Sequence, residues 1–494
     1  MVDHGKSDSP IVPANPPNKA SAAEAVEGRG LAKGNTTRPT RPGLSAGPGV
    51  SSGLDRVREV ARRDKDARFT ALLHHVDLAR LRAAYWAIRP QAAPGVDGMT
   101  WAAYGQDLET NLRGLHARVH SGAYRASPSR RAYIPKADGR QRPLGIATLE
   151  DKIVQRAVVE VLNAIYEVDF LGFSYGFRPG RSPHDALDAL TVGIKRKKVN
   201  WVLDADIRDF FTSLDHGWLQ KFLEHRIADK RVLRLIRKWV TAGVIEDGKW
   251  TASTVGAPQG ASASPLLANV YLHYVFDRWA RQWRHRHAHG DMVIVRFADD
   301  FVAGFEHQAD AQQFLADLRE RFAKFGLELH PDKTRLIEFG RHAARDRKKR
   351  GDRKPETFAF LGFTHICGKT KNGWFWIKRI TISKRMRAKL AEVKASLQRR
   401  RHHPIPEQGR WLASVVRGHL AYYAVPGNTD AVAAFRTQVT RHWFTALRRR
   451  SQRHRLNWTR MTRLANRWLP PARIQHPFPD ARFDARTQGR SPVR

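Results

Sequence analysis

Residues 292–305 read MVIVRFADDFVAGF, which is two apolar arms on either side of a pair of aspartates. Each arm has the length and the β-branched and aromatic content of a buried strand. Two adjacent carboxylates at the tip of an apolar hairpin repel each other and resist burial. A divalent cation removes this difficulty, because Mg²⁺ favours carboxylate oxygens and keeps positions open for phosphate. The stretch therefore predicts a hairpin that presents Asp299 and Asp300 to a metal ion. A solvated Asp-Asp turn would be the alternative if the dipeptide stood alone.

A second apolar stretch also turns acidic at its end. Residues 200–207 read NWVLDADI, which predicts a buried strand followed by Asp206. One more carboxylate at the end of a neighbouring strand would complete a two-metal site, in which the ions lie roughly 3.5–4 Å apart. We therefore expect Asp206 to lie close to Asp299 and Asp300.

The rest of the pattern mixes hairpins with helices, which predicts an α+β fold. A hairpin with an Asp-Gly turn is expected at 131–147, followed by a helix at 148–166 with acidic residues in its first turn. Further elements are expected as helices at 215–240, 264–285 and 309–326, a strand at 358–363, and arginine-rich helices from 383 to about 468. Residues 1–53 are rich in Pro, Gly, Ala, Ser and Thr, and predict a disordered leader.

The charge of the chain points to a polyanionic partner. The 494 residues contain 87 Lys+Arg and 47 Asp+Glu, a formal net charge of +40, of which residues 378–494 contribute +22. RNA or DNA is the first choice of partner and an anionic membrane the second. The single cysteine, Cys367, excludes an intramolecular disulfide and a multi-cysteine zinc site. Without an apolar run near 18 residues or an apolar signal core, we expect no membrane and a cytoplasmic protein.

Several motifs in a fixed order resemble those of reverse transcriptases. They are FADD at 297–300, DIRDFF at 206–211, APQG at 257–260 and SPLLAN at 264–269. Further blocks are similar to bacterial group II intron reverse transcriptase/maturases: APGVDG at 93–98, IPK at 134–136 with RPLG at 142–145, GFRPGRS at 176–182, HPDKT at 330–334 and FLGF at 360–363. The resemblance covers about residues 54–470, and an ordered series of this kind is highly specific.

The resemblance implies a right-hand polymerase. Its fingers and palm, with an antiparallel palm sheet, are expected at 54–370, and an α-helical thumb/maturase domain at 371–447. A basic C-terminal tail at 448–494 is a candidate DNA-binding segment. Cysteine pairs and a His-Asn-His pattern do not follow it, so we expect no endonuclease domain and priming from a nascent strand at a replication fork.

The resemblance also implies a role for individual residues. Asp206, Asp299 and Asp300 would hold two Mg²⁺ ions, with Mn²⁺ as an alternative, assisted by the backbone carbonyl of Ile207. Asp204 is the other candidate ligand, but its spacing to the aromatic residue of the motif is wrong. The nucleotide-binding residues would be Lys136 and Arg142 on the triphosphate, Phe211 under the sugar as a gate against ribonucleotides, Gln259 and Gly260 beside the nascent pair, and Lys333 as a weaker phosphate contact. Surface cations for Lys136, Arg142 and Lys333, and a core role for Phe211, are the alternatives.

In the basic C-terminal region, Arg417, Tyr422 and Tyr423 combine a phosphate contact with stacking surfaces for RNA. Helix packing is the alternative for the two tyrosines. The implied function is an RNA-directed DNA polymerase that binds its group II intron RNA, assists splicing and copies the intron by target-primed reverse transcription. Its partners would be the intron RNA, an RNA template with a DNA primer, a DNA target and dNTPs, with nucleoid association during integration. The alternatives are a maturase or RNA chaperone without polymerase activity, and a reverse transcriptase of a retron, a diversity-generating element or a phage-defence system.

Overall fold

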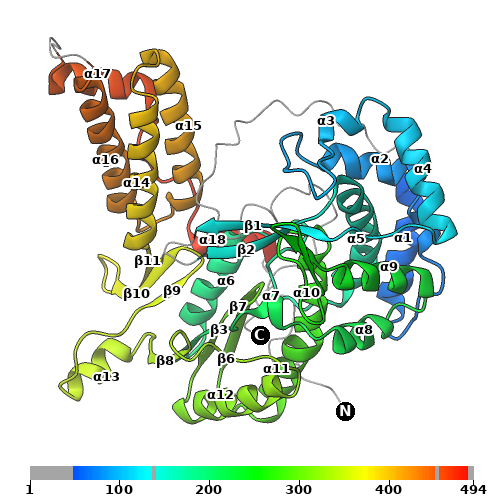
Figure 1. Cartoon of the computed structure of the whole chain (residues 1–494). Helices are drawn as coiled ribbons and strands as arrows, with labels where there is room; N and C mark the ends of the chain where they lie inside the picture. Colours follow the sequence, from blue (N-terminus) through cyan, green and yellow to red (C-terminus); the bar gives the residue numbers. More distant parts are fainter. Residues whose placement is uncertain (1–47, 136–140, 451–455, 488–494) are drawn as a thin grey trace.

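The computed structural model describes residues 48–135, 141–450 and 456–487 (Figure 1). Helices and three sheets alternate along these residues, which confirms the predicted α+β class. The predicted leader lies outside the described residues up to residue 47, and residues 48–53 already belong to helix α1 (Pro48–Arg63). Among the described helices, none is both long and apolar enough to cross a membrane.

A four-stranded antiparallel sheet lies at the centre of the molecule, with the strand order β6-β7-β3-β8. Its strands are β3 (Trp201–Asp206), β6 (Met292–Phe297), β7 (Asp300–Phe305) and β8 (Arg335–Glu338). The two apolar arms around the aspartates are the hairpin β6–β7, as the sequence predicts. All six residues of β6 are buried, because the sheet is covered on both faces.

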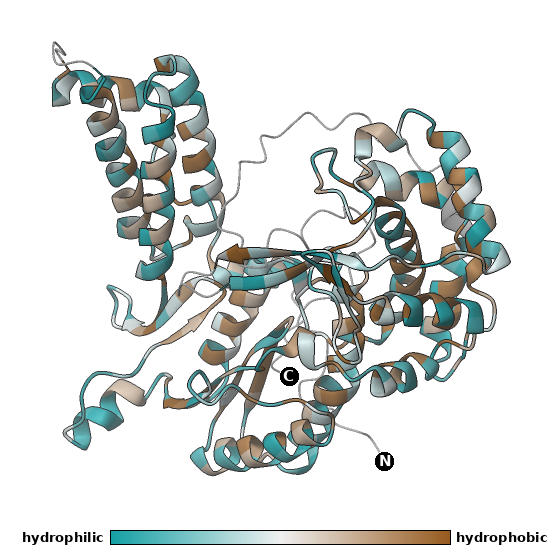
Figure 2. Ribbon diagram, in the orientation of Figure 1, coloured by the Kyte–Doolittle hydropathy of each residue, from teal (hydrophilic) through white to brown (hydrophobic). Residues whose placement is uncertain are grey.

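Alternate residues of these strands enter two separate hydrophobic cores. In β6, Ile294 packs into the core that contains α12 (Gln308–Ala323), whereas Val293 and Val295 pack into the core that contains α6 (Pro183–Arg196). Successive side chains of a strand point to opposite faces, so α6 and α12 cover opposite faces of the sheet. Figure 2 shows these strands as brown, in contrast to the hydrophilic helix α13 (Ala343–Lys349) that projects from the body.

The N-terminal helices lie around α5 (Leu149–Asp169), which confirms the helix predicted at 148–166. Thr148 caps its N-terminus by accepting a hydrogen bond from the backbone N–H of Asp151. The neighbouring elements are η2 (Leu73–His75), α2 (Leu78–Ala87), α3 (Trp101–Tyr104) and α4 (Leu108–Ser121). A second sheet has the order β2-β1-β4-β5 and consists of β1 (Ser129–Pro135), β2 (Gln141–Ile146), β4 (Val244–Glu246) and β5 (Lys249–Thr251). The predicted hairpin is β1–β2; its Asp-Gly turn lies outside the described residues.

Two of the predicted helices are interrupted. The one predicted at 215–240 is two helices, α8 (His216–Glu224) and α9 (Lys230–Thr241), because Asp229 caps a new N-terminus with its side chain. The one predicted at 264–285 contains a π-helical turn, η3 (His273–Asp277), between α10 (Ser264–Leu272) and α11 (Arg278–Arg286). A short helix, α7 (Phe210–Ser213), follows β3.

The C-terminal part consists of a three-stranded sheet and a group of long helices. The sheet has the order β11-β10-β9, with β9 (Phe358–Phe360), β10 (Phe363–Lys369) and β11 (Phe375–Thr381). The helices are α14 (Ser383–Arg399), α15 (Ile405–Tyr423), α16 (Thr429–Arg448), α17 (Trp458–Trp468) and α18 (Pro479–Thr487). Helix α17 contacts α15 and α16, whereas α18 returns to the central part and packs on α6 (Figure 1). The two described helices after residue 448 are therefore both packed against other parts of the chain.

Candidate active site

The turn between β6 and β7 has a strained backbone. Ala298 adopts φ = +57°, a conformation that an L-residue with a Cβ rarely takes. The backbone of Gly176 passes directly beneath it: a Cβ on Gly176 would lie 2.2 Å from the backbone nitrogen of Ala298. The GFRPGRS motif thus supplies a glycine where the turn needs close backbone contact, and a residue with a Cβ would clash there.

A fully buried arginine, Arg296, holds the same turn through hydrogen bonds. Nη1 of Arg296 donates to the carbonyl oxygen of Ala298 at 2.9 Å and to Oδ1 of Asn269 at 3.0 Å. Its Nε and Nη2 donate to the two carboxylate oxygens of Asp277 at 2.7 and 2.6 Å, and Nη2 also donates to Oγ of Ser174 at 2.7 Å. The side chains of Arg296 and Asp277 are both 0% exposed. Burial raises the pKa of Asp277, and the guanidinium of Arg296 opposes this shift.

This arginine is a positioning residue that the sequence analysis missed. The signal was present: a charged residue stands inside the otherwise apolar arm MVIVRF. A buried charge requires a partner and further hydrogen bonds. The sequence does not show that the partner is Asp277, or that Asn269 of the SPLLAN motif lies beside it.

The carboxylates meet on one face of the central sheet. Asp206 lies directly opposite Asp300 in the register of β3 with β7, and Asp204, two residues earlier on β3, points to the same face. Burial raises the pKa of Asp300 well above its ordinary value, and the negative charges of Asp204, Asp299 and Asp206 raise it further. The pKa of Asp204 is raised to about 6 by burial, although Arg335 opposes the shift. Asp204, which the motif spacing disfavours as a ligand, therefore belongs to the same electrostatic group.

Lys333 is also part of this group. Its ammonium forms an ion pair with the carboxylate of Asp206, with the lysine side chain about half exposed. The backbone supports the same contact, since His330 N donates to the carbonyl oxygen of Asp206 at 2.8 Å and Ile207 bridges to Leu329. Within the described residues, no three acidic, histidine or cysteine side chains are already arranged as a metal cage. The donor set is nevertheless suitable for a hard divalent cation, because the carboxylates repel one another and offer oxygen ligands.

The loop at 256–260 joins two of the other predicted motifs. Ala257 N donates to the carbonyl oxygen of Phe211 at 2.7 Å, and Gly145 N donates to that of Gln259 at 2.7 Å. Gly260 has φ = +104°, and a Cβ there would lie 3.3 Å from the carbonyl oxygen of Gly145. The loop thus connects α7 to β2.

The predicted nucleotide-binding residues differ in exposure. Arg142 is half-buried on β2, opposite Ile134 of β1, and Gln259 is also half-buried. Phe211 is 6% exposed and packs against Phe210. Lys136 lies outside the described residues.

The expected stacking surfaces at Tyr422 and Tyr423 are not present in the structure. The hydroxyl of Tyr422 donates to the carbonyl oxygen of Leu361 at 2.7 Å, and its ring stacks on Phe363. Tyr423 is buried and contacts the same Phe363. Both rings pack the helix α15 onto the sheet β9–β11, which corrects the expectation of exposed rings. Arg417 is exposed on the same helix.

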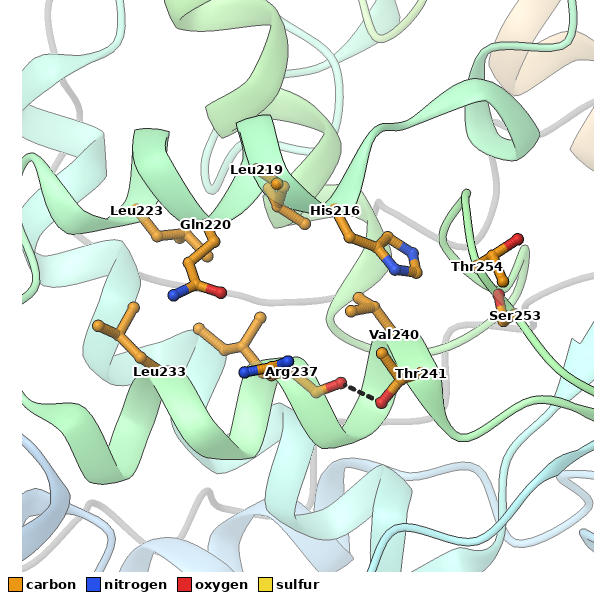
Figure 3. Close-up of a pocket in the computed structure, with 12 residues that line it drawn as sticks. His216, Leu219, Gln220, Leu223, Leu233, Arg237, Val240, Thr241, Ser253 and Thr254 are labelled. Carbon is orange, nitrogen blue, oxygen red and sulfur yellow. Dashed lines mark hydrogen bonds between the residues drawn. The ribbon is translucent and has the colours of Figure 1, made fainter.

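A cavity of about 380 Å³ lies between α8 and α9 (Figure 3). Its walls combine apolar residues such as Leu219 and Val240 with His216 and Arg237. Nε2 of His216 pairs with the carbonyl oxygen of Gly256 at 2.6 Å, and Ser253 and Thr254 also line the cavity, so it borders the segment that leads into the 256–260 loop. The predicted site residues are not among those that line it.

Sequence comparison agrees with the geometry of the carboxylates. A family model described as "Reverse transcriptase (RNA-dependent DNA polymerase)" matches residues 134–365, which include both aspartate strands and the 256–260 loop. The chain is 34% identical over 300 residues to Protein YkfC of Escherichia coli (strain K12), an alignment that covers 52% of this chain and 78% of YkfC. The chain belongs to the reverse transcriptase family, of the group II intron-encoded reverse transcriptase/maturase type.

Relatives from introns support this type. The chain is 34% identical over 224 residues to the Group II intron-encoded protein LtrA of Lactococcus lactis subsp. cremoris, covering 44% of this chain and 37% of LtrA. It is 34% identical over 166 residues to the Putative COX1/OXI3 intron 2 protein of Saccharomyces cerevisiae, covering 33% of this chain and 19% of that protein. The alignments therefore span well under half of these intron proteins.

Proposed function

We propose that this chain polymerises DNA on an RNA template, binds its group II intron RNA, assists splicing and copies the intron into a DNA target. The observation that carries the polymerase assignment is the cross-strand pair Asp206–Asp300, with Asp299 in the adjoining turn. Group II intron RNA, an RNA template with a DNA primer, the DNA target and dNTPs are the corresponding partners.

The three aspartates would hold two Mg²⁺ ions, with the carbonyl of Ile207 as a further ligand. When bound, the ions supply the charge that activates the primer 3′-OH and stabilises the departing pyrophosphate. The chain contributes the positions of the carboxylates, which the Arg296 network and Gly176 fix through the backbone of Ala298. Lys333 forms an ion pair with Asp206 in the structure. Its side chain is about half exposed, so its ammonium could bind a phosphate oxygen of the nucleotide instead.

The nucleotide would lie against the surface that β1–β2 and the 256–260 loop form together, where Gly145 N donates to the carbonyl oxygen of Gln259. Arg142 and Lys136 suit a triphosphate, and a guanidinium can bind phosphate oxygens in bidentate fashion. Phe211, beside the loop and 6% exposed, would present one edge of its ring to the sugar and exclude a 2′-OH. Gln259 and Gly260 would line the nascent pair, where φ = +104° and the absence of a side chain permit close approach.

In polymerase terms, residues 54–370 would be the fingers and palm, with β6-β7-β3-β8 as the palm sheet, and residues 371–447 the thumb. The segment 448–494 is the candidate DNA-binding part. The charge supports nucleic-acid binding by the thumb and the C-terminal segment together, since residues 378–494 carry +22 of the +40. Arg417 is exposed and is the best placed of the three predicted RNA-binding residues.

The test is primer extension on an RNA template with Mg²⁺, together with a splicing assay on the flanking intron RNA. Asp299→Ala should abolish cDNA synthesis and retain RNA binding. Asp66→Ala, which changes an exposed aspartate near α1, is the matched control. Undiminished synthesis by Asp299→Ala would refute the site. Splicing activity in a wild-type chain that synthesises no cDNA would favour the maturase alternative.

A further inference from the structure

The hairpin β10–β11 ends in a tightly bonded turn that exposes a tryptophan. Thr370 N donates to the carbonyl oxygen of Trp374 at 2.8 Å, and Trp374 N donates to Oγ1 of Thr370 at 3.1 Å. Gly373 supplies the positive φ of +79° that the turn requires. Trp374 is 74% exposed, the highest value among the large hydrophobic side chains of the described residues. A fixed backbone thus presents an indole ring to solvent.

The exposed ring belongs to a longer aromatic and basic face. Alternation along the strand places Trp374, Trp376 and Lys378 on one side, whereas Ile377 and Arg379 are buried on the other. The stem of Lys378 lies over Gly368 of the paired strand, 3.6 Å from where a Cβ would be.

The C-terminal segment extends this face. Phe478, which directly precedes α18, contacts Trp376 edge-on with ring centroids 5.8 Å apart and is itself 59% exposed. Two parts of the chain that are a hundred residues apart in sequence therefore form one aromatic surface.

The charge around this face selects a polyanion as the ligand. Residues 363–381 of the hairpin contain no Asp or Glu, and their one buried cation, Arg379, pairs with Asp188 on the other side. Lys369, Lys371 and Lys378 of the hairpin are all exposed. An apolar protein partner would not require this charge, and a base-paired duplex offers no open base face to an indole. A single strand offers both phosphates and unpaired bases.

This face is separate from the carboxylates. The end of β10 that pairs with β9 adjoins the carboxylates, since the backbone N–H of Ala359 on β9 donates a hydrogen bond to Asp204. Strand β10 has seven residues, so at about 3.4 Å per residue its tip lies roughly 20 Å from that end.

We propose that the outer face of β10–β11, with Phe478, is a stacking site for unpaired bases of a single-stranded RNA. Trp374 is the main stacking surface, and Lys371 and Lys378 neutralise the adjoining phosphates. The inference rests on the proposed function in that nucleic acid is the partner, but it requires no polymerase activity.

The test is a titration of the full chain, without dNTPs, against a fluorescently labelled 12-nucleotide oligouridylate and an abasic strand of the same length, read by anisotropy. Trp374→Ala should weaken oligouridylate binding about 10-fold, within the range for loss of one stacked base. It should leave binding of the abasic strand unchanged, and Trp374→Phe should restore most of the lost affinity. Trp86→Ala, at a tryptophan on α2 that is 52% exposed, is the matched control.

Lys371→Gln provides a second readout, because loss of one phosphate contact should reduce the salt slope of binding by about 0.7. If Trp374→Ala weakens the binding of oligouridylate and of the abasic strand equally, or weakens neither, the stacking site is refuted. The same holds if Trp86→Ala has the larger effect. Since no dNTPs are present, a chain that fails as a polymerase would still give a clear result here.

Discussion

The buried pair Arg296–Asp277 leads to a prediction that separates stability from activity. Asp277→Asn removes the negative charge and keeps the volume, so the guanidinium of Arg296 stays buried without a counter-charge. Both side chains are 0% exposed and are joined by two hydrogen bonds of 2.7 and 2.6 Å. Removing one partner of a buried ion pair lowers the free energy of unfolding by about 3–5 kcal/mol. We expect a loss of this size in the free energy of unfolding, measured by urea titration.

The double variant Arg296→Met/Asp277→Leu tests what the pair does for the site. Replacing both partners by apolar residues avoids the buried charge and should recover part of the lost stability. Recovery should be incomplete, because Ala298, Asn269 and Ser174 lose a donor, at about 1–3 kcal/mol for each buried group left unpaired. Primer extension should stay low, since the Ala298 carbonyl is no longer held and the Asp299–Asp300 turn is free to relax.

An exposed ion pair serves as the control. Arg208 and Glu328 lie 3.1 Å apart with side chains 56% and 64% exposed, so Glu328→Gln should change stability by less than about 1 kcal/mol. A loss below about 1 kcal/mol in Asp277→Asn would refute the account of the buried pair. Full polymerase activity in the double variant would refute the positioning role of Arg296.

Three further predictions follow from other parts of the molecule. Phe211→Val should reduce the preference for dNTPs over rNTPs about 10-fold or more in a misincorporation assay, because the smaller side chain admits a 2′-OH; an unchanged ratio would reject the gate. Burial lowers the pKa of His365 to about 3. Between this value and the ordinary pKa of 6.5, the unfolded chain binds a proton at His365 and the folded chain does not. Stability is therefore lost as the pH falls from about 6.5 towards 3, and His365→Leu should remove up to about 1.4 kcal/mol per pH unit of this decline in urea titrations; an identical pH slope in the variant would contradict the shift. Arg417→Gln should weaken intron-RNA binding and reduce its salt slope by roughly 0.7–0.9, one phosphate contact, and a constant slope would exclude Arg417 from the interface.

The parts of the fold that could be predicted from the sequence are those set by local patterns. The hairpin around Asp299–Asp300 and the helix after Thr148 follow from strand content and capping residues. The division between α8 and α9 is also local, because Asp229 is a good N-cap, but the apolar periodicity on both sides concealed it. The packing of Tyr422 and Tyr423 on Phe363 could not be predicted in this way, since it depends on contacts about sixty residues apart.

The candidate site likewise combines features that local sequence patterns predict with features that depend on contacts between distant segments. Asp206 faces Asp300 because two recognisable strands pair, and the motif order indicates that they do. The inclusion of Asp204 and Lys333 in the same electrostatic group depends on which strand borders β3, which periodicity does not reveal. The positive φ of Ala298 also has no sequence signal of its own, because it depends on Gly176 from a distant segment and on the hydrogen bond from the neighbouring Arg296, whose side chain is held in turn by the distant Asp277.

The docking of α18 on α6 has a consequence for the order in which the protein matures during translation. Arg196 on α6 pairs with Asp480 and Asp484, the latter 288 residues away along the chain, and Arg482 joins Arg379 on Asp188. A nascent chain has completed the strands that carry the aspartates long before these contacts can form. Asp188 therefore acquires its second cation only when residues 479–487 have left the ribosome. A ribosome stalled before that point would hold a chain in which Asp206, Asp299 and Asp300 are all synthesised and the face of α6 that contacts α18 is still uncovered.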